Sequence, residues 1–318
     1  MYVAPTFLMK HPRHRLVADL SRKSADVADR KFNCDSLLRF AAQLEPGDNL
    51  VSWDVSDAFF HVPLSPADQL RLAFEVGNRV FLPLVLPFGM KLSPYVFAKV
   101  MRPVVAALRR RGLRLSAYKE DFAATARSTL PSSPSGATAA RVAALELFSS
   151  LGISVHLRKR AVSSTTTLPL LGFVLDMERG HLLLPPSIQG VVMAAARALS
   201  TAVSTGARRV TFKALQRFAG KAVSWSLALP AARLYLRLLY AAQRGPLAHR
   251  SVKLCHGALR DLRWWRNFAS SPDVGRALWP AALGTLKTDA SPWEWRGMGN
   301  LFPPAGFSRR PRGRRTST

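Results

Sequence analysis

Hydrophobic residues follow two different spacings along the first half of the chain. Residues 50–55 are rich in β-branched and aromatic side chains, which predicts a strand, and we expect a further strand at residues 113–118. Between them, apolar residues recur every three or four positions from 96 to 108, so we expect a long helix that begins at Ser93. Residues 139–151 predict a second amphipathic helix. We therefore expect both strands and helices in this half of the chain.

Two more features complete the predicted elements: a hairpin within the first half of the chain and a helical region in the second half. Residues 71–75 and 79–84 predict the two strands of a hairpin joined by a Gly-Asn turn, and residues 170–175 predict one more strand. After a Pro-Pro pair, residues 187–268 favour helix almost throughout. We therefore expect a mixed region of strands and helices, followed by a helical one.

Acidic residues stand at the ends of two predicted strands. Asp54 closes the strand 50–55, and Glu120 and Asp121 lie at the bend that follows the strand 113–118. Carboxylates at the ends of adjacent strands can converge on one point, which is the arrangement that a two-metal site for phosphoryl transfer needs. Most aspartates at strand ends are ordinary turn residues, so the pair alone is a weak indication of such a site.

The charge of the chain indicates a polyanionic partner. Its 318 residues include 46 Lys and Arg against 19 Asp and Glu, a formal net charge of +27, and the isoelectric point is near 11.5. Hydrophobic residues make up 48%, which is enough for a core and excludes a chain that is only a disordered basic tail. Nucleic acid is the first candidate. A compositional bias towards Arg and Ala without any binding role is the alternative.

Several classes are disfavoured by composition. Two cysteines, Cys34 and Cys255, exclude a disulfide scaffold, and no Cys/His spacing makes a zinc site. No run of about 18 uncharged apolar residues predicts a membrane span. At the N-terminus the basic residues follow the apolar ones, which is the reverse of a secretory signal. We expect a nuclear or cytoplasmic protein that is not secreted and has no membrane partner.

Five stretches carry a resemblance by their order and spacing: 54–64 (DVSDAFFHVPL), 86–97 (with LPFGM and then SP), 117–122 (AYKEDF), 151–159 and 171–175 (LGFVL). They resemble motifs A to E of reverse transcriptases, specifically those of DIRS-like (tyrosine-recombinase) retrotransposons. Residues 13–20 resemble the fingers strand of that family, and Thr288-Asp289-Ala290-Ser291 with Trp293 resembles the start of a ribonuclease H domain. The resemblance extends from Lys10 to Asn300.

The resemblance implies a polymerase architecture of the α+β class. We expect partial fingers in residues 1–48, a palm with an inserted fingers hairpin in 49–185, and a helical thumb or connection in 186–278. The palm would be an antiparallel sheet with helices on one face. Residues 279–318 would hold a truncated ribonuclease H start and a basic tail.

The resemblance also implies roles for individual residues. Asp54, Glu120 and Asp121 would be the catalytic carboxylates of an RNA-directed DNA polymerase, and Mg²⁺ or Mn²⁺ would be held by Asp54, the Val55 carbonyl and Asp121. The residues that would contact the deoxynucleoside triphosphate are Val55, Phe59, Phe88, Gly89, Arg15 and Lys159. Phe59 would exclude a ribose 2′-hydroxyl by steric clash, and Lys159 would act on the leaving pyrophosphate. Phe59 is equally typical of a core aromatic, and Arg15 and Lys159 of solvated surface charges.

The stretch 117–122 (AYKEDF), which we call the acidic box, departs from the family pattern. The family has two aspartates where this chain has Glu120 and Asp121, and an apolar residue where it has Lys119. The extra methylene of Glu moves the carboxylate by roughly 1 Å, and misplacements of that size can cost about 10²-fold in rate. An impaired enzyme, a catalytically inactive nucleic-acid-binding remnant and a decayed element without function therefore stay open. With Asp289 as the one carboxylate at its expected place, we expect no nuclease activity.

Three basic residues share a predicted helix face in the C-terminal half. Lys213, Arg217 and Lys221 step by four positions, so their side chains point the same way. The region corresponds to the thumb in the resemblance, and contacts to phosphates are expected. An ordinary solvated face is the alternative. The implied partners are an RNA template with a DNA primer, or an RNA–DNA hybrid, and the sequence leaves the oligomeric state open.

Overall fold

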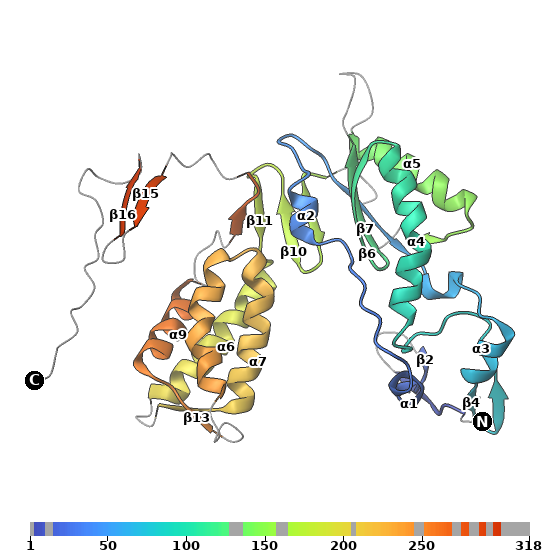
Figure 1. Cartoon of the computed structure of the whole chain (residues 1–318), viewed down its shortest axis with the longest axis horizontal. Helices are drawn as coiled ribbons and strands as arrows, with labels where there is room; N and C mark the ends of the chain where they lie inside the picture. Colours follow the sequence, from blue (N-terminus) through green and yellow to red (C-terminus); the bar gives the residue numbers. More distant parts are fainter. Residues whose placement is uncertain are drawn as a thin grey trace, which may run out of the picture. The chain divides into compact units, whose positions relative to one another are not determined.

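The computed structural model describes residues 3–9, 15–126, 136–156, 165–204, 208–244, 251–268, 275–279, 286–290 and 295–299. The chain divides into two compact units, Met1–Leu278 and Trp279–Thr318 (Figure 1). Helices and antiparallel sheets occur together in the first unit, which confirms the predicted α+β class. The finer division into four domains stays a prediction, and the basic tail lies outside the described residues.

A four-stranded antiparallel sheet forms the palm region, in the order β6-β7-β3-β8. Its strands are β3 (Val51–Val55), β6 (Leu113–Tyr118), β7 (Asp121–Ala126) and β8 (Val155–His156). Helices α4 (Ser93–Arg110) and α5 (Gly136–Ser150) pack on one side of it, as expected (Figure 1). The short helix α2 (Leu37–Ala41) contacts β6 from the other side.

Alternation along β3 decides which side chains enter the core. Val51, Trp53 and Val55 point towards α4 and α5 and pack with Phe122 and Phe148. Ser52 and Asp54 point to the opposite face, because successive residues of a strand alternate. The palm core thus fixes the face on which Asp54 lies.

The segment around the palm contains two hairpins and two short helices: β1 (Thr6–Met9) with β2 (Arg15–Ala18), β4 (Phe74–Val76) with β5 (Arg79–Phe81), α1 (Ser21–Ala25) and α3 (Pro66–Arg71). The predicted hairpin with its Gly-Asn turn is confirmed, but its first strand begins at Phe74 and not at Arg71, since Arg71 ends α3. Ser65 caps this helix by accepting a hydrogen bond from the Asp68 N–H, and Pro66 occupies its first turn. The Ser-Pro-x-Asp signal was present but was overlooked.

A second antiparallel sheet follows, in the order β14-β11-β10-β9. Its strands are β9 (Thr167–Leu170), β10 (Phe173–Asp176), β11 (His181–Leu183) and β14 (Gly275–Ala277). The predicted single strand over residues 170–175 was wrong. Leu171 and Gly172 have φ values of 50° and 82° and reverse the chain between β9 and β10.

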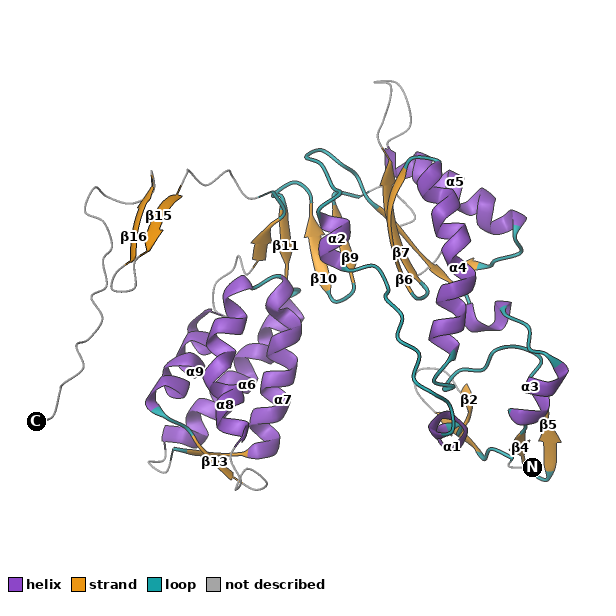
Figure 2. Cartoon of the chain, in the orientation of Figure 1, coloured by secondary structure: helices purple, strands orange, loops and turns teal. Residues whose placement is uncertain are grey.

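The C-terminal region is helical but not entirely so (Figure 2). Its helices are α6 (Pro186–Ser204), α7 (Phe212–Ser224), α8 (Arg237–Ala241) and α9 (His256–Phe268), with the 3₁₀ turns η2 (Trp225–Leu227), η3 (Pro230–Leu236) and η4 (Ala242–Arg244). Helix α6 packs against α7 and α9, around the buried Phe218 and Trp265. The expectation of nearly continuous helix misses β12 (Arg209–Thr211) and β13 (Ser251–Lys253), which pair with each other.

The second unit contains one antiparallel pair, β15 (Leu286–Ala290) with β16 (Trp295–Gly299), in which Asp289 lies opposite Arg296. Among the helices that the structure describes, none has the length and apolarity needed to cross a membrane.

Candidate active site

The site is built around two aspartates on neighbouring strands of the palm sheet. In the antiparallel pairing of β3 with β7, Asp54 lies directly opposite Asp121. Residues opposed in this way point to the same face, with Cβ atoms about 4.5–5.5 Å apart. The two carboxylates therefore project together from the face that α4 and α5 leave uncovered, and Oδ1 of Asp54 is buried there. The predicted meeting of Asp54 and Asp121 is present in the structure.

Strand β8 borders the same position on the other side. His156 lies opposite Asp54, and Val55 lies opposite Val155. Asp54 thus occupies the middle of three strands, where the ladder on both sides limits its movement. The Val55 side chain is buried in the palm core, so its backbone is the part that the site can use.

The turn that joins β6 to β7 carries the remaining acidic residue. Tyr118 pairs with Asp121, which leaves Lys119 and Glu120 as the two residues of a hairpin loop. Lys119 has a φ of 55°, as the first loop residue of a type II′ turn requires. The Glu120 carbonyl accepts a hydrogen bond of 3.0 Å from the Val55 N–H, which ties the turn to the end of β3. The backbone of the box is thus held in place whatever side chain position 120 carries.

The structure does not gather Glu120 with the two aspartates into a larger cluster. Within the described ranges, no group of three or more His, Cys, Asp or Glu side chains lies close enough to hold a metal ion. Lys119 lies with its Nζ 5.8 Å from the centre of the Tyr118 ring and forms no ion pair with a described carboxylate. A third carboxylate ligand at Glu120 stays a prediction.

Aromatic side chains connect the turn after β3 to the turn before α4. Phe59 lies in the 3₁₀ turn η1 (Ala58–His61) and is buried, with its ring centre 4.8 Å from that of Phe88 and 5.8 Å from that of Phe97. Phe88 is 46% exposed, so it borders solvent above Phe59. Phe59 is therefore a member of the palm core, and one of its neighbours faces outwards.

Gly89 lies next to strand β2 and has a left-handed backbone conformation. Its φ is 87°, and a Cβ placed on it would lie 3.7 Å from the Ala18 carbonyl oxygen of β2. A non-glycine residue would be strained in this conformation. The turn at Phe88 and Gly89 thus lies between the core aromatic Phe59 and strand β2, and its contact with a nucleotide stays a prediction.

Two predicted residues cannot be placed at the site. Lys159 lies outside the described residues, and Arg15 begins β2 but its side chain is outside them as well. Their predicted contacts with the triphosphate stay predictions.

A further residue of this region escaped the sequence reasoning. The Ser154 N–H donates a hydrogen bond of 3.0 Å to Nε2 of His61, and the Ser56 N–H donates one of 2.8 Å to the Ser154 carbonyl. These bonds join the turn after Asp54 to the segment leading into β8. Nothing in the spacing of His61 indicates this role, because its partner is 93 positions away.

A largely buried ion pair joins strand β6 of the palm sheet to the segment that precedes β3. Arg114 of β6 donates two hydrogen bonds to the Asp48 carboxylate, at 2.6 and 2.9 Å, and one of 2.8 Å to the Gln43 carbonyl. Both charged side chains are largely buried, at 15% and 10% exposure. Bidentate geometry of this kind fixes the position of the strand as well as its charge.

The predicted cationic face is present on α7. Lys213, Arg217 and Lys221 are exposed, while Leu215 and Phe218 on the opposite side are buried. The Thr211 hydroxyl accepts a hydrogen bond from the Ala214 N–H and caps the helix, as its type predicts. The shared exposed face is confirmed, and its role in binding stays a prediction.

Comparisons with known proteins agree with this geometry. The model of the family "Reverse transcriptase (RNA-dependent DNA polymerase)" matches residues 8–175. Protein P of heron hepatitis B virus is 28% identical over 170 residues, which cover 52% of this chain and 21% of the relative. Protein P of duck hepatitis B virus (strain China) is 29% identical over 173 residues, with the same coverage. The chain therefore spans about a fifth of the length of these curated relatives.

Solved structures show the same fold. The foamy viral protease-reverse transcriptase dRH in complex with double-stranded DNA is 18% identical, with a TM-score of 0.64 over 97% of this chain and 51% of that one. The foamy viral protease-reverse transcriptase in complex with an RNA/DNA hybrid has a TM-score of 0.61 at 17% identity, over 97% of this chain and 39% of that one. Since the family model matches more than half of its residues, this chain belongs to the reverse transcriptase family.

Proposed function

We propose that the chain is the core of an RNA-directed DNA polymerase. In its reaction the 3′-hydroxyl oxygen of a primer bonds to the α-phosphorus of a deoxynucleoside triphosphate, and the bond from that phosphorus to pyrophosphate breaks. The observation that carries the proposal is the position of Asp54 opposite Asp121, on one face of the palm sheet. This pair lies inside the region that the family model matches.

The two aspartates fit a site for Mg²⁺ or Mn²⁺. Both offer hard carboxylate oxygens, and Mg²⁺ is usually held in proteins by one or two carboxylates together with substrate phosphates. A third protein ligand is therefore not required. Bound divalent ions would supply charge neutralisation for the transferring phosphoryl group. Asp54 and Asp121 would hold them, and the ladder on both sides of Asp54 would keep the oxygens in place.

The aromatic cluster would select the sugar. Phe59 lies five positions after Asp54 and is held by Phe88 and Phe97. A ring that cannot move aside excludes a 2′-hydroxyl by clash, so deoxynucleotides would be preferred. Gly89 would allow the backbone to approach the nucleotide.

A template–primer duplex would lie along the cationic face of α7. The foamy viral relatives were solved with double-stranded DNA and with an RNA/DNA hybrid, which supports this class of partner. Lys213, Arg217 and Lys221 would contact phosphates without reading sequence. We further propose that the chain derives from a DIRS-like retrotransposon and that Asp289 lies in a truncated ribonuclease H start.

Primer extension tests the proposal. Wild-type chain should extend a DNA primer on an RNA template in the presence of Mg²⁺. Asp54→Asn should reduce the rate by more than about 100-fold, the loss that even outer-shell partners of a metal can cause. The exposed Glu146 of α5 gives the matched control, since Glu146→Gln removes the same charge away from the site. Extension that survives Asp54→Asn would overturn the proposal.

A catalytically inactive nucleic-acid-binding protein is the second candidate, and Glu120 favours it. The turn is fixed by the Val55 to Glu120 hydrogen bond, so the longer side chain is not compensated by a shift of the backbone. Primer extension by Glu120→Asp but not by the wild type would establish that the wild-type chain is the catalytically inactive protein. Extension by wild type would exclude it.

A further inference from the structure

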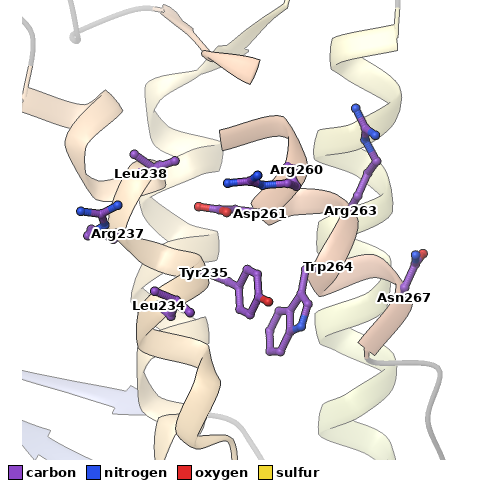
Figure 3. Close-up of a pocket in the computed structure, with 9 residues that line it drawn as sticks. All are labelled: Leu234, Tyr235, Arg237, Leu238, Arg260, Asp261, Arg263, Trp264 and Asn267. Atoms are coloured by element: carbon purple, nitrogen blue, oxygen red, sulfur yellow. The ribbon is translucent and has the colours of Figure 1, made fainter. Parts of the chain in front are cut away.

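A cavity in the helical region has no part in the proposed polymerase site. It has a volume of about 520 Å³ and lies between η3, α8 and α9 (Figure 3). The side chains that give it chemical character are Tyr235, Arg237, Arg260, Asp261, Arg263 and Trp264. A volume of this size is within the range of about 300–1,000 Å³ that is typical of small-molecule sites.

Asp261 is the unusual member of this group. It is 5% exposed, and its Oδ2 finds no hydrogen-bond partner in the part of the chain that the structure describes. Figure 3 shows its carboxyl group directed from α9 towards the space between Arg260 and Arg237. Burial raises the pKa of Asp261, and the positive charges of Arg260 and Arg237 oppose that change in part. A buried carboxylate without a partner is costly, so a hydrogen-bond donor from outside would stabilise it.

Three arginines give the rim of the cavity a positive charge. Arg237, Arg260 and Arg263 are exposed, and their side chains form no ion pair or hydrogen bond with described residues. Arg260 and Arg263 lie three positions apart on α9 and therefore share a face. Guanidinium groups in this arrangement favour a phosphate, which they can bind with paired hydrogen bonds.

An aromatic pair forms another wall. The rings of Tyr235 and Trp264 are stacked, with their centres 4.0 Å apart and an angle of 9° between their planes. Trp264 is braced in turn by Trp265, whose ring lies edge-on at 5.1 Å. Flat rings that are held this rigidly make good stacking surfaces for a nucleobase.

We infer that this cavity binds a ribonucleotide 5′-phosphate, as a free nucleotide or as one unit of a single-stranded RNA. The three arginines would bind its phosphate, Asp261 would accept a hydrogen bond from a ribose hydroxyl, and the base would rest against Tyr235 and Trp264. A ribose hydroxyl is the donor that Asp261 lacks, and phosphate is the anion that the arginines lack.

Isothermal titration calorimetry on the full chain tests the inference. AMP, dAMP, inorganic phosphate and a 5′-phosphorylated single-stranded RNA would be titrated in the presence of EDTA, which removes divalent ions that the polymerase site needs. AMP should bind at least about 10-fold more tightly than dAMP, because a hydrogen bond to a charged group is lost without the 2′-hydroxyl. If AMP binds and the RNA displaces it, the cavity accepts both a free nucleotide and a nucleotide within a strand. If only the RNA binds, the ligand of the cavity is a nucleotide within a strand. Binding of neither AMP nor RNA overturns the inference, as does equal affinity for AMP and dAMP.

Variants locate the binding. Asp261→Asn should abolish most of the preference for AMP over dAMP, and Arg263→Gln should weaken both by about 10-fold or more. Arg263 is exposed, so this variant keeps the test valid even if Asp261→Asn affects folding. Arg79→Gln of β5 removes an equal charge outside the cavity and is the matched control, while Asp54→Asn alters the polymerase site. Neither should change AMP binding, and a loss of binding in Asp54→Asn would assign the nucleotide to the palm instead.

Discussion

The palm and the helical region each bury a carboxylate, but only the palm supplies it with a partner. Asp48 receives two hydrogen bonds from Arg114, which lies on the neighbouring strand β6. Asp261 has Arg237 and Arg260 nearby, yet its Oδ2 has no partner within the described residues. Burial of a charge is tolerated when the pairing is complete and is costly when it is not. The difference agrees with a structural role for Asp48 and with the nucleotide site that we propose at Asp261.

The largest expected effect comes from breaking the complete pair. Asp48→Asn removes the bidentate counterion of the buried Arg114 guanidinium and leaves it Glu45 at 3.8 Å, so the free energy of unfolding should fall by about 3 kcal/mol. Urea unfolding followed by circular dichroism measures it. Asp68→Asn is the control, because Asp68 is paired with Arg71 on the surface and should lose about 1 kcal/mol or less. If both variants lost a similar amount of unfolding free energy, burial of the Asp48–Arg114 pair would not be the cause of its effect.

The second prediction distinguishes a catalytic role of Asp121 in the palm from a structural one. Asp121→Asn should reduce primer extension by more than about 100-fold. Its unfolding midpoint should stay close to that of the wild type, since Asp121 lies at a strand end beside a turn. A variant that unfolds as Asp48→Asn does would show that Asp121 is a structural residue.

The third effect concerns the cationic face of α7. Replacing Lys213, Arg217 and Lys221 together by Gln should make the dependence of duplex binding on salt shallower, by a slope of about 2.7. Fluorescence anisotropy with a labelled RNA–DNA hybrid at several salt concentrations measures this slope. The triple replacement of Arg22, Lys23 and Arg79 by Gln removes the same charge elsewhere. An equal change of slope in the two variants would show that the net charge of the chain, and not this face, drives binding.

The smallest effect has the opposite sign from the first. Asp261→Asn should raise the free energy of unfolding at neutral pH by about 1–2 kcal/mol, because an unsatisfied buried charge is removed. The pKa of Asp261 is raised in the folded chain, so protonation favours folding, and stability is lost as the pH rises through the folded value. The advantage of Asp261→Asn should therefore shrink at acid pH. Thermal melts across the acid range check this, and a destabilised variant at neutral pH would mean that Asp261 has a partner in solution.

The palm site could be predicted from sequence because its parts are local. The alternation in residues 50–55 fixes the face of Asp54, and the acidic box lies in a two-residue turn that brings Asp121 alongside. By contrast, the hairpin at Leu171 and Gly172 was missed because an apolar run continues through the turn. A leucine at positive φ gives no sequence signal.

Pairings between distant residues were also out of reach. Arg114 and Asp48 are 66 positions apart, and Val210 of β12 pairs with Val252 of β13 across two helices. The cavity around Asp261 is formed by residues of η3, α8 and α9, and no periodicity in the sequence predicts it. What sequence patterns miss here is tertiary contact, which propensity and spacing do not encode.

The bond between His61 and Ser154 restricts what evolution can place at position 61. A backbone N–H can only donate, so the ring nitrogen that faces it must carry a lone pair. The imidazole ring of His61 offers such a lone pair at Nε2. Asparagine or glutamine could substitute, whereas lysine or arginine, which only donate, would release the loop that precedes β8. A change to a basic residue would thus loosen the chain locally, next to Asp54.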